Sequence, residues 1–381
     1  MDAVQPPIVP FVAELIRQSP GTISLGQGVV HYGPPAAAAD AVREALARPE
    51  THDYGDGLGT PALVAAIAGK LRRENGIDVD RGWRLMVTAG ANMAFTHAVT
   101  AITAPGDEII LNVPFYFNHE MAVQMAGCTP VRVATDERYQ LRPDALRRAI
   151  TDRTRAIVTV SPNNPSGAVL SEASLHEVDA LCAERGLYHI VDEVYEYFTY
   201  GPAAHVSPGS FAGAAARTIA IYSLSKAYGM AGWRVGYVAY PEHLADAMSK
   251  IQDTTLICAP IASQAAALAA LSAGRAHCAP HVRALAEVRQ IVLARLAELG
   301  PIATVPAADG AFYVLLRVHT DMDPLALAER LIREHRVAVI PGSAFGMTGG
   351  CYFRVAYGAL QKDTVAEGIG RLVGGLRAIV A

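Results

Sequence analysis

The chain has 381 residues, of which 51% are hydrophobic and 18% charged, and its formal net charge is -4. This composition is typical of a compact globular protein rather than a disordered one, and the length favours two domains. The acidic balance provides neither a basic surface for nucleic acid nor a polybasic cluster for a membrane surface. Five scattered cysteines, an odd number without metal-ligand spacing, favour a reducing compartment, and we expect no metal.

The N-terminus and the apolar runs favour a cytoplasmic protein without a membrane partner. The first residues, Met-Asp-Ala-Val-Gln-Pro-Pro, resemble neither a signal peptide nor a transit peptide. No uninterrupted apolar run reaches the length of a membrane span, because Ser263 and Gln264 interrupt the alanine-rich stretch 259–273.

The first two thirds of the chain alternate between helix and strand patterns. Thr60 and Pro61 predict a helix start, as N-cap and first helical residue, and Asn75-Gly76 predicts its end. Strands are then expected at 84–88, 108–113, 156–160, 187–191, 218–222 and 235–239, and helices at 92–103, 143–150 and 171–185. This alternation predicts an α/β fold in which helices cover both faces of a mainly parallel sheet.

After about residue 275 the pattern changes to that of a smaller α+β unit. A long amphipathic helix is expected at 281–299, followed by a strand at 311–318, a helix at 324–335, strands at 337–340 and 352–356, and a final helix. Because no linker or repeat separates the two units, we expect them to pack closely. We predict a large domain at 46–280 and a small domain formed by 1–45 and 281–381.

Polar residues directly follow five of the apolar runs. The five segments are 89–92, 114–116, 161–167, 192–195 and 223–226. Ligands of open parallel sheets bind beyond the carboxyl ends of the strands. The sequence therefore predicts that these five segments meet at one edge of the sheet.

Lys226 is the most informative residue at this edge. The chain has only four lysines: Lys70, Lys226, Lys250 and Lys362. A lysine that is desolvated or close to other cations can lose its proton and capture a carbonyl as a Schiff base, which arginine cannot do. The alternative is a solvated surface charge. A position directly after an apolar strand, with Ser223, Ser225 and Arg234 nearby, is not typical of a surface lysine.

Two groups of residues are suited to hold a phosphate near this lysine. Gly90, Ala91 and Asn92 turn a strand into a helix, and the N–H groups at a helix N-terminus bind anions. The second group, which adds hydroxyl donors and a permanent charge, consists of Ser223, Ser225 and Arg234. An ordinary strand-to-helix turn would explain the first group equally well.

Four further residues are candidates for binding a flat, nitrogen-containing ring. Asp192 ends an apolar run, where its carboxylate needs a partner such as a protonated pyridine nitrogen, a helix terminus or an ion pair. Tyr195 and Asn164 can hydrogen-bond a ring oxygen, and Tyr116 can stack on a ring face. Core packing would also explain these last three residues.

Arg354 lies in the strand-like stretch 351–357. A charge on an edge strand is the simple explanation for it. A planar guanidinium is also the best side chain for bidentate capture of a carboxylate.

Taken in chain order, these residues resemble the class I and II aminotransferases, which are pyridoxal-phosphate enzymes of fold type I. The landmarks are Leu25-Gly-Gln-Gly28, Tyr54-Gly55, Gly90-Ala-Asn92, Asn164-Pro-Ser-Gly167, Asp192-Glu-Val-Tyr195, Ser223-x-Ser-Lys226, Gly232-x-Arg234-x-Gly236 and Arg354. The resemblance implies that the large domain is a three-layer sandwich with a mainly parallel sheet, accompanied by a smaller α+β domain.

The resemblance also implies roles in binding pyridoxal phosphate. Lys226 would hold the cofactor as a Schiff base and then move a proton between it and the substrate Cα, while Asp192 would pair with the ring nitrogen. Tyr195 and Asn164 would bind the ring hydroxyl oxygen, and Tyr116 would stack on the ring. The phosphate would be held by Gly90, Ala91, Asn92, Ser223, Ser225 and Arg234.

Substrate binding and assembly are implied in the same way. Arg354, Asn164 and Gly28 would bind the substrate α-carboxylate. Tyr54 resembles the tyrosine that reaches the cofactor phosphate of the partner subunit, which implies a homodimer with shared sites. The reaction would be a ping-pong transfer of the amino group from an L-amino acid to a 2-oxo acid.

The sequence departs from the usual family pattern near the substrate. Val29–Tyr32 replaces the common Pro-Asp-Phe after Gly28, in a segment that borders the substrate side chain in the family. Segment 255–261 has no basic residue, although aspartate-specific members of one type carry an arginine there. Other landmarks resemble plant-type aromatic and methionine aminotransferases. An aromatic or methionine-like donor is therefore favoured, and an aspartate or broad-range enzyme remains open.

Two other functions compete with transamination. A C–S lyase or a decarboxylase on the same scaffold would need the same lysine and ring-nitrogen acid. The aminotransferase-like sensor of a transcription regulator would need a DNA-binding domain, and the acidic charge of this chain disfavours it.

Overall fold

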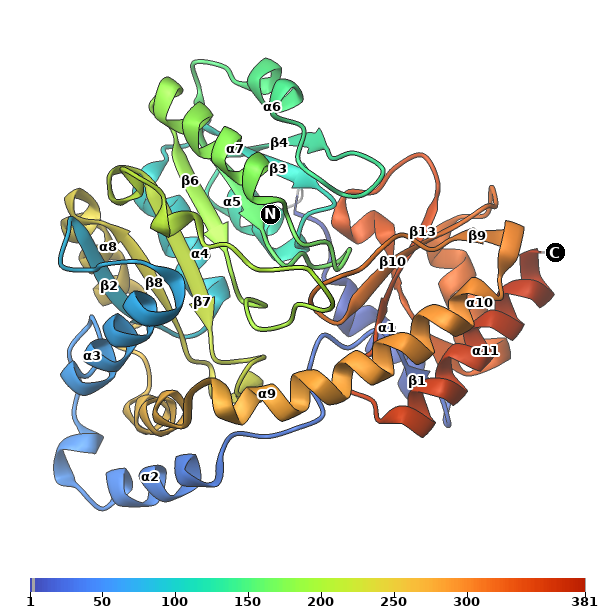
Figure 1. Ribbon diagram of the computed structural model, residues 1–381, viewed down its shortest axis with the longest axis horizontal. Helices are drawn as coiled ribbons and strands as arrows, with labels where there is room; N and C mark the ends of the chain where they lie inside the picture. Colours follow the sequence, from blue (N-terminus) through green and yellow to red (C-terminus); the bar gives the residue numbers. More distant parts are fainter. Residues whose placement is uncertain (2–3, 381) are drawn as a thin grey trace.

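The computed structural model describes Met1 and residues 4–380, and its two main sheets are joined by a long helix (Figure 1). The large sheet has seven strands in the order β2-β8-β7-β6-β5-β3-β4. Neighbours from β7 to β4 are parallel, and β8 is antiparallel to both β2 and β7. The strands are β2 (Trp83–Thr88), β3 (Glu108–Val113), β4 (Thr129–Ala134), β5 (Thr154–Val160), β6 (Tyr188–Asp192), β7 (Thr218–Ser223) and β8 (Gly236–Pro241).

Helices cover both faces of this sheet, as the alternating pattern predicted. The helices are α3 (Pro61–Lys70), α4 (Ala91–Ile102), α5 (Phe117–Met125), α6 (Pro143–Ala149), α7 (Glu172–Arg185) and α8 (Ala245–Thr255). Ile109 and Leu111 of β3 pack with α4, α5 and α8 in one core, whereas Ile110 packs with α3, α6 and α7 in another. Successive strand residues thus enter opposite layers, which confirms the three-layer α/β architecture.

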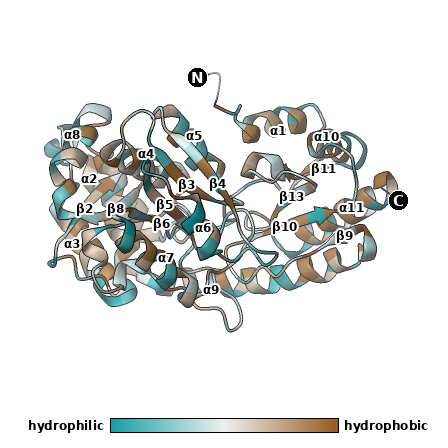
Figure 2. Cartoon of the chain, turned by 90° about the horizontal axis from the view of Figure 1, so that it is seen from above, coloured by the Kyte–Doolittle hydropathy of each residue, from teal (hydrophilic) through white to brown (hydrophobic). Residues whose placement is uncertain are grey.

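Six of the seven strands were predicted to within two residues at either end, and β4 was missed. It lies at the edge of the sheet, where it pairs only with β3, and it contains Pro130 and Arg132. An edge strand tolerates proline and polar residues that a central strand excludes, so the apolar pattern was absent. In Figure 2 hydrophobic residues colour much of the central strands, whereas α6 on the outside is largely hydrophilic.

The second main sheet is antiparallel and has the order β12-β13-β10-β9. Its strands are β9 (Ala303–Thr304), β10 (Tyr313–Val318), β12 (Ile340–Pro341) and β13 (Cys351–Ala356). Near it lie α1 (Ile8–Arg17), α10 (Pro324–His335), α11 (Lys362–Val380) and a parallel pair formed by β1 (Ile23–Ser24) and β11 (Val337–Ala338). The N-terminal segment therefore joins the C-terminal unit, as expected, while the exact domain boundaries stay a prediction.

The helix that links the two sheets is longer than the predicted 281–299. Helix α9 runs from Ile261 to Ala297 and is interrupted at Gly274, whose φ of 62° is not helical, with Pro280 shortly after it. It extends below both sheets in Figure 1, and α2 (Ala36–Leu46) packs against it. None of the helices in the described part of the chain has the combined length and apolar character that crossing a membrane requires.

Candidate active site

A pocket of about 200 Å³ lies where the carboxyl ends of the large-sheet strands face the second sheet. Twelve of the fourteen predicted site residues line it: Gly28, Ala91, Asn92, Tyr116, Asn164, Asp192, Tyr195, Ser223, Ser225, Lys226, Arg234 and Arg354. Gly90 lies directly beside it, against Arg234. The wall also contains Val9, Phe117, Val160, Val194 and Tyr313, which were not predicted. The five strand-end segments predicted from the sequence therefore converge at one edge.

Lys226 follows β7 by three residues and lies in the wall of this pocket. Its Nζ donates to the carbonyl oxygen of Gly28 at 2.5 Å, and no carboxylate forms an ion pair with it in the part of the chain that the structure describes. Desolvation, together with the positive charges of Arg354 and Arg234, lowers the pKa of Lys226 to about 8, although Asp192 opposes the shift. A sizeable neutral fraction, which is the nucleophilic form, is therefore present near neutral pH.

Asp192 is the last residue of β6 and is buried. Its Oδ1 accepts a bond from the backbone N–H of Val194 at 3.2 Å, and its Oδ2 lies 3.1 Å from Nε2 of His119. The imidazole of His119 stacks on Phe95 with ring centroids 3.9 Å apart, which fixes its orientation. His119 was missed from the sequence. The available signal was its position on α5, three residues after Tyr116, but nothing local indicated that it reaches Asp192.

Arg354 belongs to β13, an interior strand of the second sheet, and only 3% of its surface is exposed. The explanation as an edge-strand charge is therefore wrong. Its guanidinium donates to Oδ1 of Asn164 at 3.0 Å and to the carbonyl oxygen of Gly26 at 2.6 Å. Its Nε has no partner among the described residues, and no carboxylate neutralises it there. A buried guanidinium that lacks an anion is suited to receive one from a ligand.

Two tyrosines are joined by a hydrogen bond in the pocket wall. The hydroxyl of Tyr195, which follows β6, lies 2.7 Å from the hydroxyl of Tyr313 at the start of β10. Burial raises the pKa of both side chains, to about 12 for Tyr313 and well above the ordinary value for Tyr195. Both therefore remain hydrogen-bond donors at neutral pH. The sequence predicted Tyr195 and missed Tyr313, although it placed Tyr313 in a strand.

The other end of the pocket is built for an anion. Gly90 has a φ of +86°, and a Cβ at this position would lie 2.4 Å from Nη2 of Arg234. Only glycine fits this conformation and close approach, and α4 begins directly afterwards. Ser223 and Ser225 lie beside the first turn of α4 in the same wall. Helix N–H groups, two hydroxyls and a guanidinium are thus gathered in one place.

Two segments singled out in the sequence lie outside the wall of this pocket, and their expected roles stay predictions. Tyr54 lies in the turn before α3, is 83% exposed, and is absent from the pocket wall. In the segment after Gly28, Tyr32 donates to the carbonyl oxygens of Lys226 and Ala227 at 3.1 and 3.2 Å. None of Val29–Tyr32 is in the wall of this pocket, and its expected place beside the substrate side chain stays a prediction. Val9, Phe117 and Tyr313 contribute the apolar surface instead.

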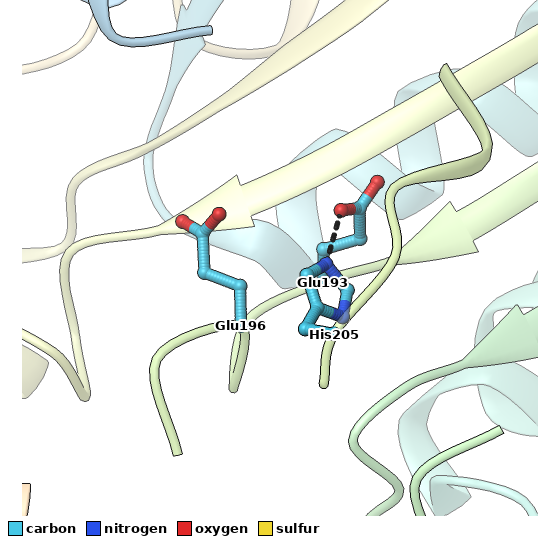
Figure 3. Close-up of side chains that lie close together, drawn as sticks. All are labelled: Glu193, Glu196 and His205. Carbon is cyan, nitrogen blue, oxygen red and sulfur yellow. Dashed lines mark hydrogen bonds and ion pairs between the residues drawn. The ribbon is translucent and has the colours of Figure 1, made fainter. Parts of the chain in front are cut away.

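One cluster away from the pocket superficially resembles a metal site. Glu193, Glu196 and His205 place one ligand atom each within 4.8 Å of the others (Figure 3). Glu193 already accepts bonds from His205, Ser207 and Tyr222, at 2.7, 2.8 and 2.9 Å. Glu196 accepts bonds from Lys70 at 2.5 Å and from Asn75 at 2.9 Å. Both carboxylates are satisfied by the protein, so the cluster is a structural network.

Comparisons with known proteins agree with this geometry. The family model described as "Aminotransferase class I and II" matches residues 20–372. The chain is 36% identical to aromatic aminotransferase ISS1 of Arabidopsis thaliana, over 98% of this chain and 94% of that one. It is 35% identical to an aspartate aminotransferase of Pyrococcus abyssi, over 98% and 96% of the two chains.

A solved structure gives the same result. The crystal structure of an aromatic aminotransferase from Pyrococcus horikoshii superimposes with a TM-score of 0.89 at 35% identity, covering 96% of this chain and 99% of that chain. Matches of this extent, to a family model and to curated and solved relatives, establish the kind of enzyme. The chain is a transaminase and belongs to the class I and II aminotransferases.

Proposed function

We propose that this enzyme moves the amino group of an L-amino acid to a 2-oxo acid with pyridoxal phosphate bound at Lys226. The observation that carries the proposal is the pairing of two unneutralised cations in one pocket. Lys226 has a pKa of about 8 and no carboxylate partner among the described residues. Arg354 is buried and likewise has no carboxylate partner among them. A nucleophilic amine and a carboxylate receptor in one cavity fit an amino acid substrate.

The pocket residues fit the cofactor from one end to the other. The anion site at Gly90 and Arg234 would hold the phosphate, because a Cβ at Gly90 would fill the cradle. Asp192, oriented by His119, would pair with the ring nitrogen and keep it protonated. When bound, the protonated ring would supply an electron sink for the negative charge that develops at the substrate Cα.

The remaining pocket residues would orient both ligands. Tyr195 and the side-chain amide of Asn164 would donate to the ring oxygen, and Tyr116 would cover one ring face. Arg354 would bind the α-carboxylate and so hold the Cα hydrogen towards Lys226. Lys226, whose amine faces the same pocket, would carry that proton as the general base. Since a single guanidinium of this kind serves donor and acceptor in turn, we expect ping-pong kinetics.

The donor is proposed to be an aromatic or methionine-like amino acid. Val9, Phe117 and Tyr313 provide an apolar and aromatic surface, and the only cations in the described wall are Lys226, Arg234 and Arg354. The similarity to an aspartate aminotransferase of Pyrococcus abyssi supports a broad-range enzyme as the alternative. A PLP-dependent C–S lyase on the same fold is separated by its products, pyruvate and ammonia.

The assembly is proposed to be a homodimer in which Tyr54 reaches the partner's cofactor phosphate. Tyr54, in the turn before α3, is 83% exposed, and Leu46, the last residue of α2, is 50% exposed. Large apolar side chains exposed together favour a contact with another chain.

All five cysteines are free, which fits a reducing compartment, and we propose the cytoplasm. We also propose that the chain is divided into a large domain, residues 46–280, and a small domain, residues 1–45 together with 281–381.

A single-turnover half-reaction tests the proposed function. Purified holoenzyme is mixed with one amino acid at a time, without an oxo acid, while the absorbance of the bound cofactor is followed. We expect conversion to the pyridoxamine form with stoichiometric release of the matching oxo acid, fastest with aromatic donors. If none of the common amino acids produces this change, the transaminase assignment of the site is refuted, whereas release of pyruvate and ammonia from cysteine derivatives would indicate the lyase.

A further inference from the structure

The hydroxyl pair of Tyr195 and Tyr313 is, like the bond from Arg354 to Asn164, a direct hydrogen bond between side chains of the two sheets in the pocket wall. Tyr195 follows β6 of the large sheet, and Tyr313 begins β10 of the second sheet. Tyr195 is proposed above to donate to the ring oxygen of the cofactor. The ring of Tyr313 is assigned above to the apolar surface of the wall, whereas its hydroxyl has been given no role.

Tyr313 is held in place on several sides. Its residue is completely buried, and Arg354 packs over its ring with the guanidinium carbon 4.8 Å from the centroid. The ring of Tyr195 meets it edge-on, with centroids 5.5 Å apart. A Cβ on Gly28 would lie 2.6 Å from the Tyr313 hydroxyl, so glycine is needed there for the hydroxyl to occupy its position. The hydroxyl is therefore directed at Tyr195 by packing, not by chance rotation.

Counting hydrogens decides the direction of the bond. Each phenol has one proton to donate, and neither hydroxyl makes another bond to the described part of the chain. If Tyr195 gives its proton to the ring oxygen, its own oxygen can only accept from Tyr313. The two hydroxyls then form a chain in which each bond polarises the next, and Tyr195 becomes a stronger donor than it would be alone.

We propose that Tyr313 is a positioning residue, whose hydroxyl donates to Tyr195 and so directs the single proton of Tyr195 to the ring oxygen of the cofactor. The inference rests on the proposed function, because it assumes the cofactor in this pocket. It adds that the paired strands β10 and β13 carry two groups for the site. Arg354 on β13 would bind the carboxylate, and Tyr313 on β10 would orient Tyr195, the donor to the ring oxygen. Leu315, two residues after Tyr313, is the register partner of Arg354 in this pair.

The test is a pH titration of the absorbance of the bound cofactor in the Tyr313→Phe holoenzyme. A donor to the ring oxygen stabilises the form in which that oxygen bears more negative charge, and this is the form that has lost a proton. Removing the hydroxyl should therefore raise the midpoint, by about half to one pH unit, the size expected for the net contribution of one hydrogen bond between neutral groups. The Km for the donor should change less than kcat, because phenylalanine keeps the ring under Arg354.

Two further variants make the result specific. Tyr139→Phe removes another buried hydroxyl, which bonds the carbonyl oxygen of Leu315 on the same strand but lies outside the pocket, and should leave the midpoint unchanged. In the Tyr195→Phe background, Tyr313→Phe should have little additional effect, because the relay is already broken.

An equal shift of the midpoint in both backgrounds would overturn the relay, as would an unchanged midpoint in Tyr313→Phe alone. In either case a wild-type enzyme that still converts amino acids in the half-reaction retains the proposed function. A wild-type enzyme that shows no cofactor absorbance at all overturns both the function and the relay.

Discussion

Two lysines near the strand ends of the large sheet show how differently the same side chain can be used. Lys70 is buried at the end of α3, where its Nζ bonds Glu196 at 2.5 Å and Asn75 at 2.8 Å and lies 4.8 Å from the ring centroid of Tyr222. Lys226 bonds only a backbone carbonyl oxygen, and the cations Arg354 and Arg234 lower its pKa further after desolvation. One lysine is neutralised by the protein, and the other is left to a ligand.

The same division is visible between two adjacent acidic residues. Asp192 faces the pocket, whereas Glu193, the next residue, bonds His205, Ser207 and Tyr222, and Figure 3 shows its contact with His205. Alternation along the chain at the end of β6 sends them to opposite sides. The comparison teaches that a cluster of charged residues indicates a ligand site only where its charges lack partners within the protein.

The largest expected effect on this comparison comes from Lys226→Ala. Turnover of amino acid and oxo acid should fall by about a thousandfold or more, because in the proposed mechanism the substitution removes both the nucleophile and the proton carrier. The melting temperature of the apoenzyme should not fall, since the lysine makes no ion pair there. Exchange of a labelled amino group and a thermal melt measure the two effects. Retained turnover would refute the role of Lys226.

The opposite pattern is expected for Lys70→Met. Removal of this ammonium leaves the carboxylate of Glu196 in a largely buried position without its cation, which should lower the free energy of unfolding by about 3 kcal/mol or more. Chemical denaturation measures this loss, and the folded fraction should retain turnover. Lys250→Met is the matched control, because the Lys250–Asp246 pair is 72% and 82% exposed and should contribute nothing measurable.

If Lys70→Met abolished turnover in fully folded protein without lowering stability, the division between the two lysines would be wrong. The network around Glu196 would then have to communicate with the pocket. Such a result would direct attention to residues 192–196, which connect the two regions in sequence.

Much of the fold and of the site could be predicted because the signals are local. Asp192 and Lys226 directly follow apolar runs, and the carboxyl ends of parallel strands share one edge, so their convergence follows from the alternation of elements. The glycine at position 90 and its helix start are equally local. These features need only a few neighbouring residues to be recognised.

The unpredicted features depend on contacts between distant parts of the chain. His119 reaches Asp192, and Tyr313 reaches Tyr195, across separations that no periodicity encodes. The interior position of Arg354 follows from the pairing of β13 with both β10 and β12. The absence of Val29–Tyr32 from the pocket wall is of the same kind, because only tertiary packing decides which side of a segment faces a cavity.

The smallest effect is a pH dependence that isolates the environment of Lys226. Only its neutral form can bond to the cofactor aldehyde, and its pKa is about 8 instead of the ordinary 10.5. The initial rate of cofactor uptake by the apoenzyme should therefore rise about tenfold from pH 6 to pH 7 and level off above pH 9.

Two variants serve as a test and a control. Arg354→Met removes a neighbouring cation and should move the midpoint of this pH dependence upwards, whereas Arg330→Met on the surface should not. Since the cofactor's own ionisations are common to all three proteins, the difference between them reports on the lysine alone. A wild-type midpoint near 10 would mean that the ammonium is solvated, and the contrast with Lys70 would then lose its physical basis.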